Sequence, residues 1–230
     1  MTNNHIQLAV IDMAGTTVAD DGLVVSSFDA AATAVGLAET GPERERARQY
    51  VLDTMGQSKI VVFRALFGTE DRAQRANTAF ESAYEAAIAD GHAAPIDGAA
   101  EAITRLRENG VKVALTTGFS GTTQEKLLAA LGWQSLADLV LAPGDGVRGR
   151  PYPDLILTAL MRLQADGVGN VAALGDTSND VDSALRAGCA IAAGTLTGAH
   201  DEQQLRDAGA THVVPTVSHF ADLILTTEKG

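Results

Sequence analysis

Five polar or charged residues follow short apolar stretches of this chain, and their types suit the chemistry of a phosphoryl group. They are Asp12, Thr116, Arg150, Asp176 and Asp180. The apolar stretches before them are typical of buried parallel strands. Ligands of parallel α/β sheets bind at the carboxyl ends of the strands, so we expect these side chains to meet at one edge of the sheet.

Two of these residues, Asp12 and Asp176, would repel each other at that edge unless a cation lay between them. Oxygen-only ligands suit Mg²⁺. We therefore predict a Mg²⁺ site formed by Asp12, the Ala14 carbonyl oxygen and Asp176. Asp180 lies one helical turn beyond Asp176 and is expected to hold a water molecule of the metal ion.

The other polar groups are suited to bind the oxygens of the phosphoryl group. We expect Thr116, Arg150 and the backbone N–H groups of the turn at Ala14 and Gly15 to do this. Phosphoryl transfer needs mainly positioning and charge neutralisation, which this set supplies. A carboxylate held in line with phosphorus acts as a nucleophile, and Asp12 is the candidate.

Each residue taken alone has a simpler structural explanation. Asp12 would then be a turn residue, and Thr116 a β-branched strand residue. Arg150 would be a surface charge, and Asp176 would mark a helix start that the macrodipole favours. Because these explanations would have to hold at four separate strand ends, we interpret the residues as one site.

The elements that position the site alternate along most of the chain. The expected strands cover residues 6–11, 111–115, 139–141, 171–174, 190–193 and 212–214. The expected helices cover residues 98–108, 122–131, 153–163, 179–187 and 201–207. This alternation predicts an α/β fold with a doubly wound parallel sheet and right-handed crossovers.

The stretch after the first strand breaks the alternation, because it contains helical patterns and no convincing strand. The expected helices cover residues 27–35, 42–52, 58–66 with Ser58 as the N-cap, and 71–89, and residues 91–95 form a linker. We predict an all-helical insert at residues 18–95. The core would then comprise residues 1–17 and 96–230.

The composition limits the class of protein and its partners. The 230 residues are 46% hydrophobic and 20% charged, which is ordinary for a soluble globular protein. The formal net charge of −12 argues against nucleic acid or an anionic membrane as partner, but not against a small anionic substrate. No apolar stretch is long enough to span a membrane and the N-terminus has no signal-peptide pattern, so we expect a cytoplasmic protein. We expect a monomer or homodimer, with residues 60–66 as a candidate pairing helix, and a buried apolar role for the single cysteine, Cys189.

These motifs resemble the haloacid dehalogenase superfamily, whose members are Mg²⁺-dependent hydrolases that work through a covalent aspartyl intermediate. The resemblance covers essentially the whole chain. It makes Asp12 the nucleophile, Thr116 the second motif, Arg150 the third, and Asp176 with Asp180 the fourth, and it makes the helical insert the cap that closes over the substrate. The residues expected to bind the substrate are Gly15, Thr16, Met55, Gly56, Thr117 and Gly118.

Two stretches, residues 12–17 and 149–153, look more narrowly like phosphonoacetaldehyde hydrolase, which cleaves a carbon–phosphorus bond. Most phosphatases of the superfamily carry an acid where this chain has Ala14, and phosphonoacetaldehyde hydrolases use Arg in the third motif. Residues 55–59 resemble that family's Met-Gly-x-x-Lys loop, which implies that Lys59 forms a Schiff base. The start of a helix and burial under the cap would both lower the pKa of Lys59. The alternative is that Lys59 binds a substrate anion or forms a salt bridge within the cap.

The chain departs from that family's pattern at three places. Val62 stands where the family has a His, Phe119 stands where it has an aromatic hydroxyl, and residues 20–23 lack its Cys. Three hypotheses therefore remain: hydrolysis of a small phosphonate such as phosphonoacetaldehyde, hydrolysis of a small phosphate monoester such as phosphoglycolate, and a non-enzymatic receiver-like switch. The position of Asp12 on the first strand, with an insert after it, argues against the switch.

Overall fold

A computed structural model describes residues 5–227, in which six strands form one parallel sheet. The strands are β1 (Leu8–Asp12), β2 (Lys112–Thr116), β3 (Leu139–Leu141), β4 (Val171–Gly175), β5 (Ile191–Thr195) and β6 (His212–Val214). Their order in the sheet is β3-β2-β1-β4-β5-β6. The order reverses between β1 and β4, and the carboxyl ends of these two strands flank the crevice where ligands of such sheets bind.

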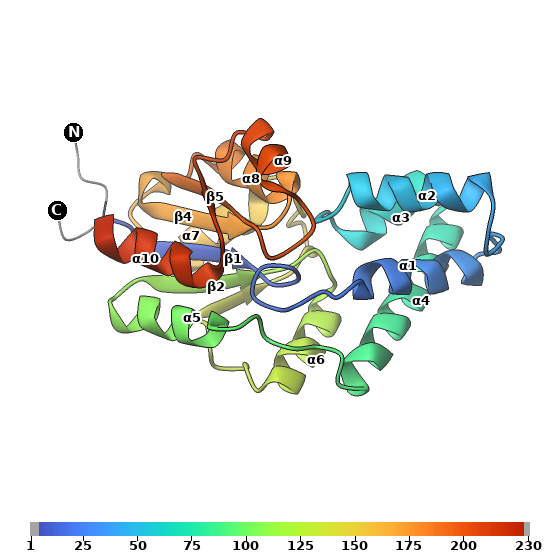
Figure 1. Cartoon of the computed structure of the whole chain (residues 1–230), viewed down its shortest axis with the longest axis horizontal. Helices are drawn as coiled ribbons and strands as arrows, with labels where there is room; N and C mark the ends of the chain where they lie inside the picture. Colours follow the sequence, from blue (N-terminus) through green and yellow to red (C-terminus); the bar gives the residue numbers. More distant parts are fainter. Residues whose placement is uncertain (1–4, 228–230) are drawn as a thin grey trace.

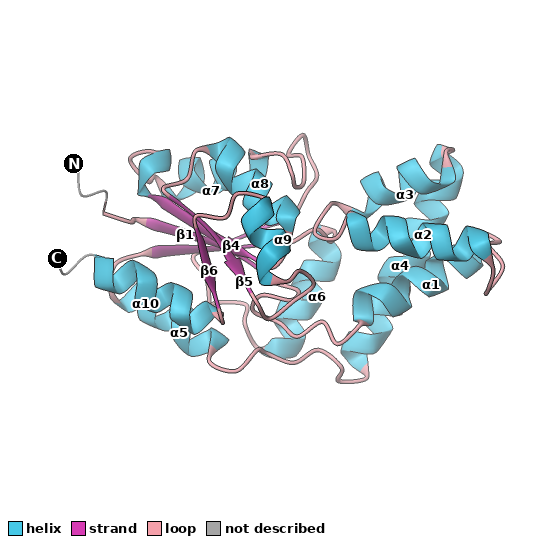
Figure 2. Ribbon diagram, turned by 45° about the horizontal axis from the view of Figure 1, so that its top comes forward, coloured by secondary structure: helices cyan, strands magenta, loops and turns pink. Residues whose placement is uncertain are grey.

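Helices cover both faces of the sheet, as Figures 1 and 2 show. On one face α5 (Ala99–Glu108) packs against α10 (Val217–Thr227), and on the other α7 (Asp154–Leu163) packs against α8 (Ser178–Ala187). The remaining elements are α6 (Gly121–Leu131), α9 (Glu202–Asp207) and the 3-10 helix Val168–Asn170. This architecture confirms the predicted α/β fold with a parallel sheet.

Four further helices lie beyond the carboxyl edge of the sheet (Figure 1). They are α1 (Leu23–Ala34), α2 (Pro42–Asp53), α3 (Lys59–Phe67) and α4 (Glu70–Ala89). Their centre is aromatic, because the ring of Phe63 lies 6.3 Å from that of Phe28 and 5.8 Å from that of Phe80. Their buried side chains belong to the same apolar core as one face of the sheet. The helical segment therefore shares an apolar core with the sheet part, which it contacts where α4 packs against α6.

Two backbone contacts join the segments that enter and leave these helices. Val18 and Pro95 form an isolated antiparallel bridge, in which the Ala19 N–H donates to the Ala94 carbonyl oxygen at 2.9 Å and the Ile96 N–H donates to the Thr17 carbonyl oxygen at 2.9 Å. The predicted linker at residues 91–95 is thus held against the segment that connects β1 to α1.

The helices differ from the prediction at two places, one in where a helix begins and one in a helix that was not expected. α1 begins at Leu23 rather than residue 27, because Val24 is buried in the core and packing outweighs the weak helix propensity of β-branched residues. α10 was not predicted, although its buried residues Val217, Phe220, Ala221 and Ile224 follow helical spacing.

Two predicted side-chain roles also need correction. Ser58 is the N-cap residue of α3, but its side chain makes no capping hydrogen bond. Cys189 is half-buried rather than fully buried, although it packs against the apolar core under α7 and α8. Burial still raises the pKa of its thiol to about 12.

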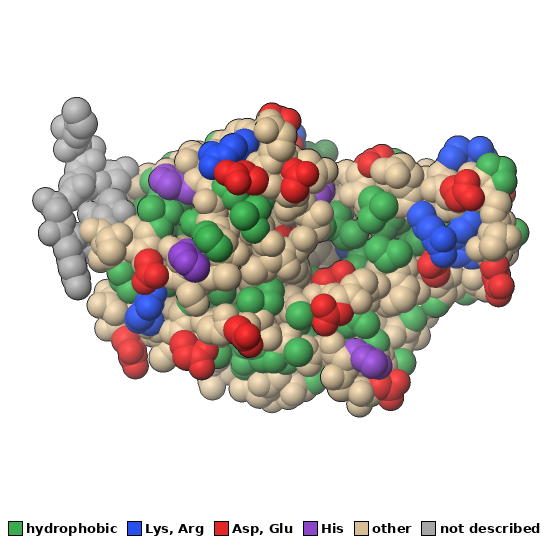
Figure 3. Space-filling view, in the orientation of Figure 1, with side chains coloured by type: hydrophobic (Ala, Val, Ile, Leu, Met, Phe, Trp, Pro, Cys, Tyr) green, Lys and Arg blue, Asp and Glu red, His purple; other side chains and the backbone are tan. Residues whose placement is uncertain are grey.

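Charged side chains are scattered over the surface in Figure 3, and a hollow lies between the part over the sheet and the part over α1–α4. None of the helices among residues 5–227 combines the length and the apolar character needed to cross a membrane.

Candidate active site at the carboxyl edge of the sheet

The ends of β1 and β4 bring two buried carboxyl groups together. Asp12 is the last residue of β1, and Asp176 directly follows β4. The Thr16 hydroxyl lies between them, 3.4 Å from an oxygen of Asp12 and 3.3 Å from an oxygen of Asp176. Together with Asp180, each carboxyl offers an oxygen within 4.8 Å of the others. The acids that the sequence placed at separate strand ends thus form one cluster.

Arg150 is the cation of this cluster, and its guanidinium bridges three partners. Nη2 lies 2.6 Å from Asp12 and donates to the Thr116 hydroxyl at 2.6 Å, while Nε lies 2.6 Å from Asp180. The Arg150 side chain is only 5% exposed. Asp180 also completes a capping box at the start of α8, where it contacts Thr177.

Burial dominates the electrostatics of the two central acids. It raises the pKa of Asp12, which Arg150 opposes by favouring the carboxylate. Burial raises the pKa of Asp176 as well, and the negative charges of Asp12 and Asp180 add to the rise. A cation bound between these acids would reduce the free-energy cost of burying their negative charges. Their all-oxygen donor set fits a hard divalent cation.

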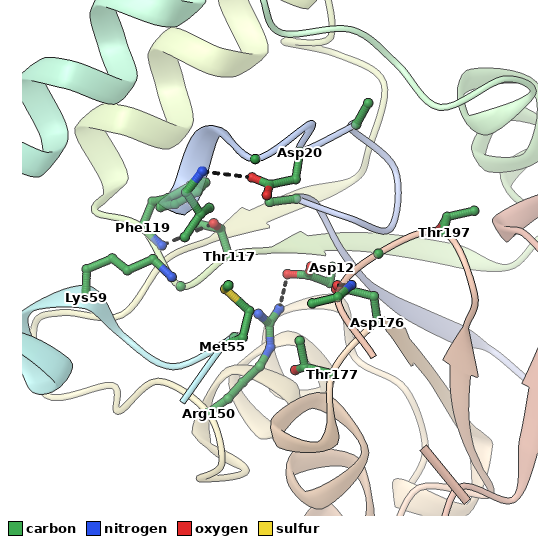
Figure 4. Close-up of a pocket in the computed structure, with 18 of the residues that line it drawn as sticks. Asp12, Asp20, Met55, Lys59, Thr117, Phe119, Arg150, Asp176, Thr177 and Thr197 are labelled. Atoms are coloured by element: carbon green, nitrogen blue, oxygen red, sulfur yellow. Dashed lines mark hydrogen bonds and ion pairs between the residues drawn. The ribbon is translucent and has the colours of Figure 1, made fainter. Parts of the chain in front are cut away.

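A pocket of about 250 Å³ opens in front of this cluster (Figure 4). The predicted residues that line it are Asp12, Ala14, Met55, Gly56, Lys59, Thr117, Gly118, Arg150 and Asp176. The predicted residues outside its wall are Gly15, Thr16, Thr116 and Asp180. Thr116 and Asp180 instead line a separate small cavity, and Arg150 borders both spaces.

One predicted contact is wrong for this conformation. The Gly15 N–H donates to the Val18 carbonyl oxygen at 2.7 Å, so it is not free to bind a phosphoryl oxygen. Gly15 has a φ of 80°, and a Cβ there would meet the Asp176 carboxylate at 2.5 Å. The residue therefore allows the turn to approach Asp176 closely.

Lys59 reaches the pocket from the first residue of α3. Its Nζ lies 5.5 Å from the centre of the Phe119 ring and 5.8 Å from that of Phe80. The Nζ atom makes no hydrogen bond or ion pair among residues 5–227. Burial is the main cause that lowers the pKa of Lys59 from 10.5 to about 8, although nearby Asp20 and Asp12 favour the ammonium.

The loop before Lys59 is seated on the sheet side of the pocket. The Lys59 N–H donates to the Gly118 carbonyl oxygen at 3.2 Å, and the Asn179 side-chain amide donates to the Met55 carbonyl oxygen at 2.7 Å. A Cβ on Gly118 would lie 2.7 Å from the Gln57 carbonyl oxygen. Gly118 thus permits a close approach that places Lys59 at the pocket.

The sequence analysis missed two parts of the wall. One is Asp20, which lies just before α1. The other is the loop at Thr197, Gly198 and Ala199, in which the Ala199 N–H donates to Asp176 at 2.7 Å. This loop follows β5, so the strand-end rule could have found it. No comparable local signal marks Asp20.

The fold and this cluster define a class of hydrolase. Residues 6–188 match the model of the haloacid dehalogenase-like hydrolases. The chain therefore belongs to this family. The receiver-like switch hypothesis is accordingly not supported.

Curated relatives fall into two groups by name. The chain is 30% identical to phosphonoacetaldehyde hydrolase of Pseudomonas putida over 197 residues, which cover 80% of this chain and 70% of that enzyme. It is 35% identical to the Bacillus cereus enzyme of the same name, but only over 44% of this chain and 39% of that enzyme. It is 28% identical to a Dickeya dadantii protein named probable phosphatase IndB, over 92% of this chain and 90% of that protein.

Solved structures agree on the fold. A hydrolase from Pseudomonas syringae has a TM-score of 0.83 at 21% identity, covering 96% of this chain and 98% of that chain. A phosphonoacetaldehyde hydrolase-like protein from Oleispira antarctica also has a TM-score of 0.83 at 21% identity, covering 97% and 93%. At this identity the likeness concerns the fold alone.

Proposed function

We propose that this protein is a Mg²⁺-dependent hydrolase that cleaves a small phosphonate such as phosphonoacetaldehyde through a covalent phosphoryl intermediate on Asp12. The observation that carries this proposal is Lys59. It is an amine on the pocket wall without an ion-pair partner among residues 5–227, and burial lowers its pKa to about 8. At pH 7 about a tenth of such a group is free amine, against roughly one part in 3,000 for an ordinary lysine.

The residues of the chain would divide the reaction between them. A carboxylate oxygen of Asp12 forms the bond to phosphorus, while Arg150 neutralises charge on the phosphoryl oxygens. The Lys59 amine condenses with the aldehyde carbon and releases water. When the carbon–phosphorus bond breaks, its electron pair moves through the carbon to the iminium nitrogen of Lys59. The enamine that results takes up a proton from solvent at the carbon that phosphorus has left. Water then hydrolyses the imine on Lys59 and the phosphoryl link to Asp12.

Asp12 and Asp176 would hold the metal ion, with the Ala14 carbonyl oxygen and Asp180 nearby. When bound, Mg²⁺ would supply charge neutralisation for the phosphoryl group. The expected substrate contacts of Met55, Gly56, Thr117 and Gly118 fit their position on the pocket wall.

Residues 18–95 are proposed to act as the cap of this enzyme. Helices α1–α4 lie over the carboxyl edge of the sheet, and the loop before α3 contributes Lys59 to the pocket. We retain a cytoplasmic location and a monomeric or homodimeric state as part of the proposal.

Hydrolysis of a small phosphate monoester, such as phosphoglycolate, is the second candidate. Two observations favour it: Val62 is buried in the core of the cap helices rather than at the pocket, and Phe119 brings no hydroxyl to the wall. The near full-length similarity to a protein named as a phosphatase points the same way. In this reaction Lys59 would only bind an anion.

Borohydride trapping distinguishes the two candidates. With phosphonoacetaldehyde and Mg²⁺, borohydride should stop phosphate release and leave a reduced adduct that mass spectrometry locates on Lys59. Exposed Lys112 and Lys126 serve as internal controls and should stay unmodified. Lys59→Arg should be inactive, because a guanidinium keeps the charge but cannot form an imine. Retention of most of the kcat in Lys59→Arg, with release of phosphate from monoesters, would instead establish the phosphatase.

A further inference from the structure

The pocket wall carries three ionisable side chains on the side away from the phosphoryl site: the half-buried Asp20, the exposed Asp21 and Lys59. Asp12, Arg150 and Asp176 lie at the carboxyl ends of the strands and are engaged with one another or with the proposed metal ion. Lys59 and Asp20 approach instead from the helical side (Figure 4). Since Ala14 brings no acid to the phosphoryl side, these two groups are the candidates for proton transfer to the leaving group.

Asp20 is held by backbone N–H groups at the start of α1. Its Oδ1 accepts a hydrogen bond from the Val24 N–H at 3.2 Å, and its carbonyl oxygen accepts one from the Leu23 N–H at 2.7 Å. The Gly22 N–H also favours the Asp20 carboxylate through a hydrogen bond. A role in starting α1 explains these contacts, but it does not explain a half-buried carboxyl group on the pocket wall.

Asp20 and Lys59 are electrostatic partners across the pocket. Asp20 is the charge with the largest influence on the pKa of Lys59, and the Lys59 charge in turn favours the Asp20 carboxylate. Burial raises the pKa of Asp20 while it lowers the pKa of Lys59. The two values therefore approach each other, which increases the population of the pair in which the amine and the carboxyl are both neutral.

We propose that Asp20 is a catalytic acid–base residue of this site, exchanging a proton with the leaving oxygen while Lys59 acts as the amine. The inference rests on the proposed function. After Lys59 has added to the aldehyde carbon, the neutral Asp20 carboxyl gives its proton to the hydroxyl on that carbon. The carbon–oxygen bond breaks, water leaves and the carbon–nitrogen double bond forms. When the final imine is hydrolysed, water adds to it and the Asp20 carboxylate takes a proton back.

Other charged groups face this pair and enter its pH dependence. Near Asp20 they are Asp21 on the same segment and Asp12 on β1, together with the neutral hydroxyl of Tyr84 on α4, whose pKa burial raises. Near Lys59 they are Asp12, Asp176 and Arg150. The test therefore needs a control for a general change of charge in the pocket.

Asp20→Asn is the decisive variant, and Asp21→Asn is its matched control. Asparagine keeps an oxygen for the Val24 N–H but cannot give up a proton. Asp21 lies on the same stretch of the pocket wall, so its replacement removes a charge there but not the proposed proton donor. It is exposed and has a φ of 43°, a conformation that asparagine tolerates. We expect Asp20→Asn to lower the kcat for phosphonoacetaldehyde by about 10²–10⁴-fold with an unchanged melting temperature. Asp21→Asn should change the kcat by less than about 3-fold, as is usual for an exposed side chain that holds no proton for the reaction.

The apparent pKa of Lys59 in Asp20→Asn, compared with the direction of the change in kcat, distinguishes acid–base chemistry from a purely electrostatic role. The modification rate of Lys59 by an amine reagent, followed against pH by mass spectrometry, gives its apparent pKa without turnover. This pKa should fall in Asp20→Asn, because a negative charge that favours the ammonium is gone. A purely electrostatic role then predicts more free amine and a higher kcat at pH 7, whereas the acid–base role predicts a lower one. A kcat within 3-fold of wild type, or an unchanged Lys59 pKa, would overturn the proposal.

A failure of the proposed function can be distinguished from a failure of the Asp20 proposal. If the wild-type protein forms no Lys59 adduct and hydrolyses only phosphate esters, the phosphonate reaction is excluded while Asp20 remains testable. Its loss should then slow alkyl esters far more than p-nitrophenyl phosphate, whose leaving group needs no proton. Equal losses for the two esters would refute the acid–base role of Asp20.

Discussion

Replacing Arg150 by methionine tests how the acid cluster is held in the folded chain. The guanidinium makes three contacts of 2.6 Å, to Asp12, Asp180 and Thr116. The two carboxyl side chains are 7% and 6% exposed, so water cannot replace the lost cation. Removing one partner of a buried ion pair costs about 3–5 kcal/mol, because the other charge stays buried and unpaired. We expect Arg150→Met to lower the free energy of unfolding by this amount at pH 8.

Arg148→Met is the matched control two residues away. Arg148 also pairs with a carboxylate, Asp154, at 2.7 Å, but its side chain is 58% exposed. Exposed pairs contribute about 0–1 kcal/mol. Urea unfolding of both variants therefore measures the effect of burial on the same type of ion pair.

The pH dependence of the Arg150 effect has a definite sign. Burial raises the pKa of Asp12 in the folded chain, and Arg150 limits that rise. A carboxyl group with a raised folded pKa destabilises the fold progressively as the pH rises from its unfolded pKa to its folded pKa, and the loss is complete above the folded value. Without Arg150 the folded pKa of Asp12 rises above its wild-type value of about 7, so the difference between variant and wild type should be small near pH 4 and should grow as the pH rises above about 7. A loss below about 1 kcal/mol, or a loss that does not change with pH, would refute this account of the cluster.

Three further predictions follow from the geometry. Calorimetry should show that Asp176→Ala weakens Mg²⁺ binding by more than about 100-fold. Asp180→Ala acts through a second layer of contacts and should weaken Mg²⁺ binding by about 10–100-fold. The reverse order would contradict the assigned ligands. Mg²⁺ affinity should rise between pH 5 and 8, because burial raises the pKa of Asp176 and bound protons must leave before the metal ion binds; affinity that is flat with pH would mean that the metal binds elsewhere. Gly118→Ala should reduce turnover at least about 10-fold, because the new Cβ would displace the loop before Lys59. Gly121→Ala should leave turnover unchanged, because its Cβ would meet nothing within 4 Å. Equal activity of the two variants in a phosphate-release assay would show that the close approach of the loop to Gly118 is unimportant.

The sequence was sufficient for the sheet and for the acids at its edge. Apolar runs such as residues 171–174 are local signals, and a residue that directly follows a parallel strand has little freedom in where it points. Asp12 and Asp176 therefore meet as predicted. The register of the sheet pairs Asp12 with Thr116, which explains how Arg150 can contact both.

Features that depend on packing between distant segments were not predictable in the same way. Whether the Gly15 N–H is free depends on the path of the chain three residues later, where the Val18 carbonyl oxygen accepts it. The position of Asp20 depends on how α1 docks against α4, which no local pattern specifies. An aspartate before a helix normally indicates only a helix start. The fold is needed to show that this one also borders the pocket.

The two halves of the site differ in what holds them in place. Strand ends fix the phosphoryl half, whereas Lys59 depends on the seat of its loop on Gly118 and Asn179. Burial is the main cause of the lowered pKa of Lys59, so a loop displaced from this seat would return the amine to water and raise its pKa toward about 10.4. At pH 7 that change would reduce the free amine by more than about 100-fold. In the proposed mechanism, the seat of this loop would therefore decide whether Lys59 can act as a nucleophile.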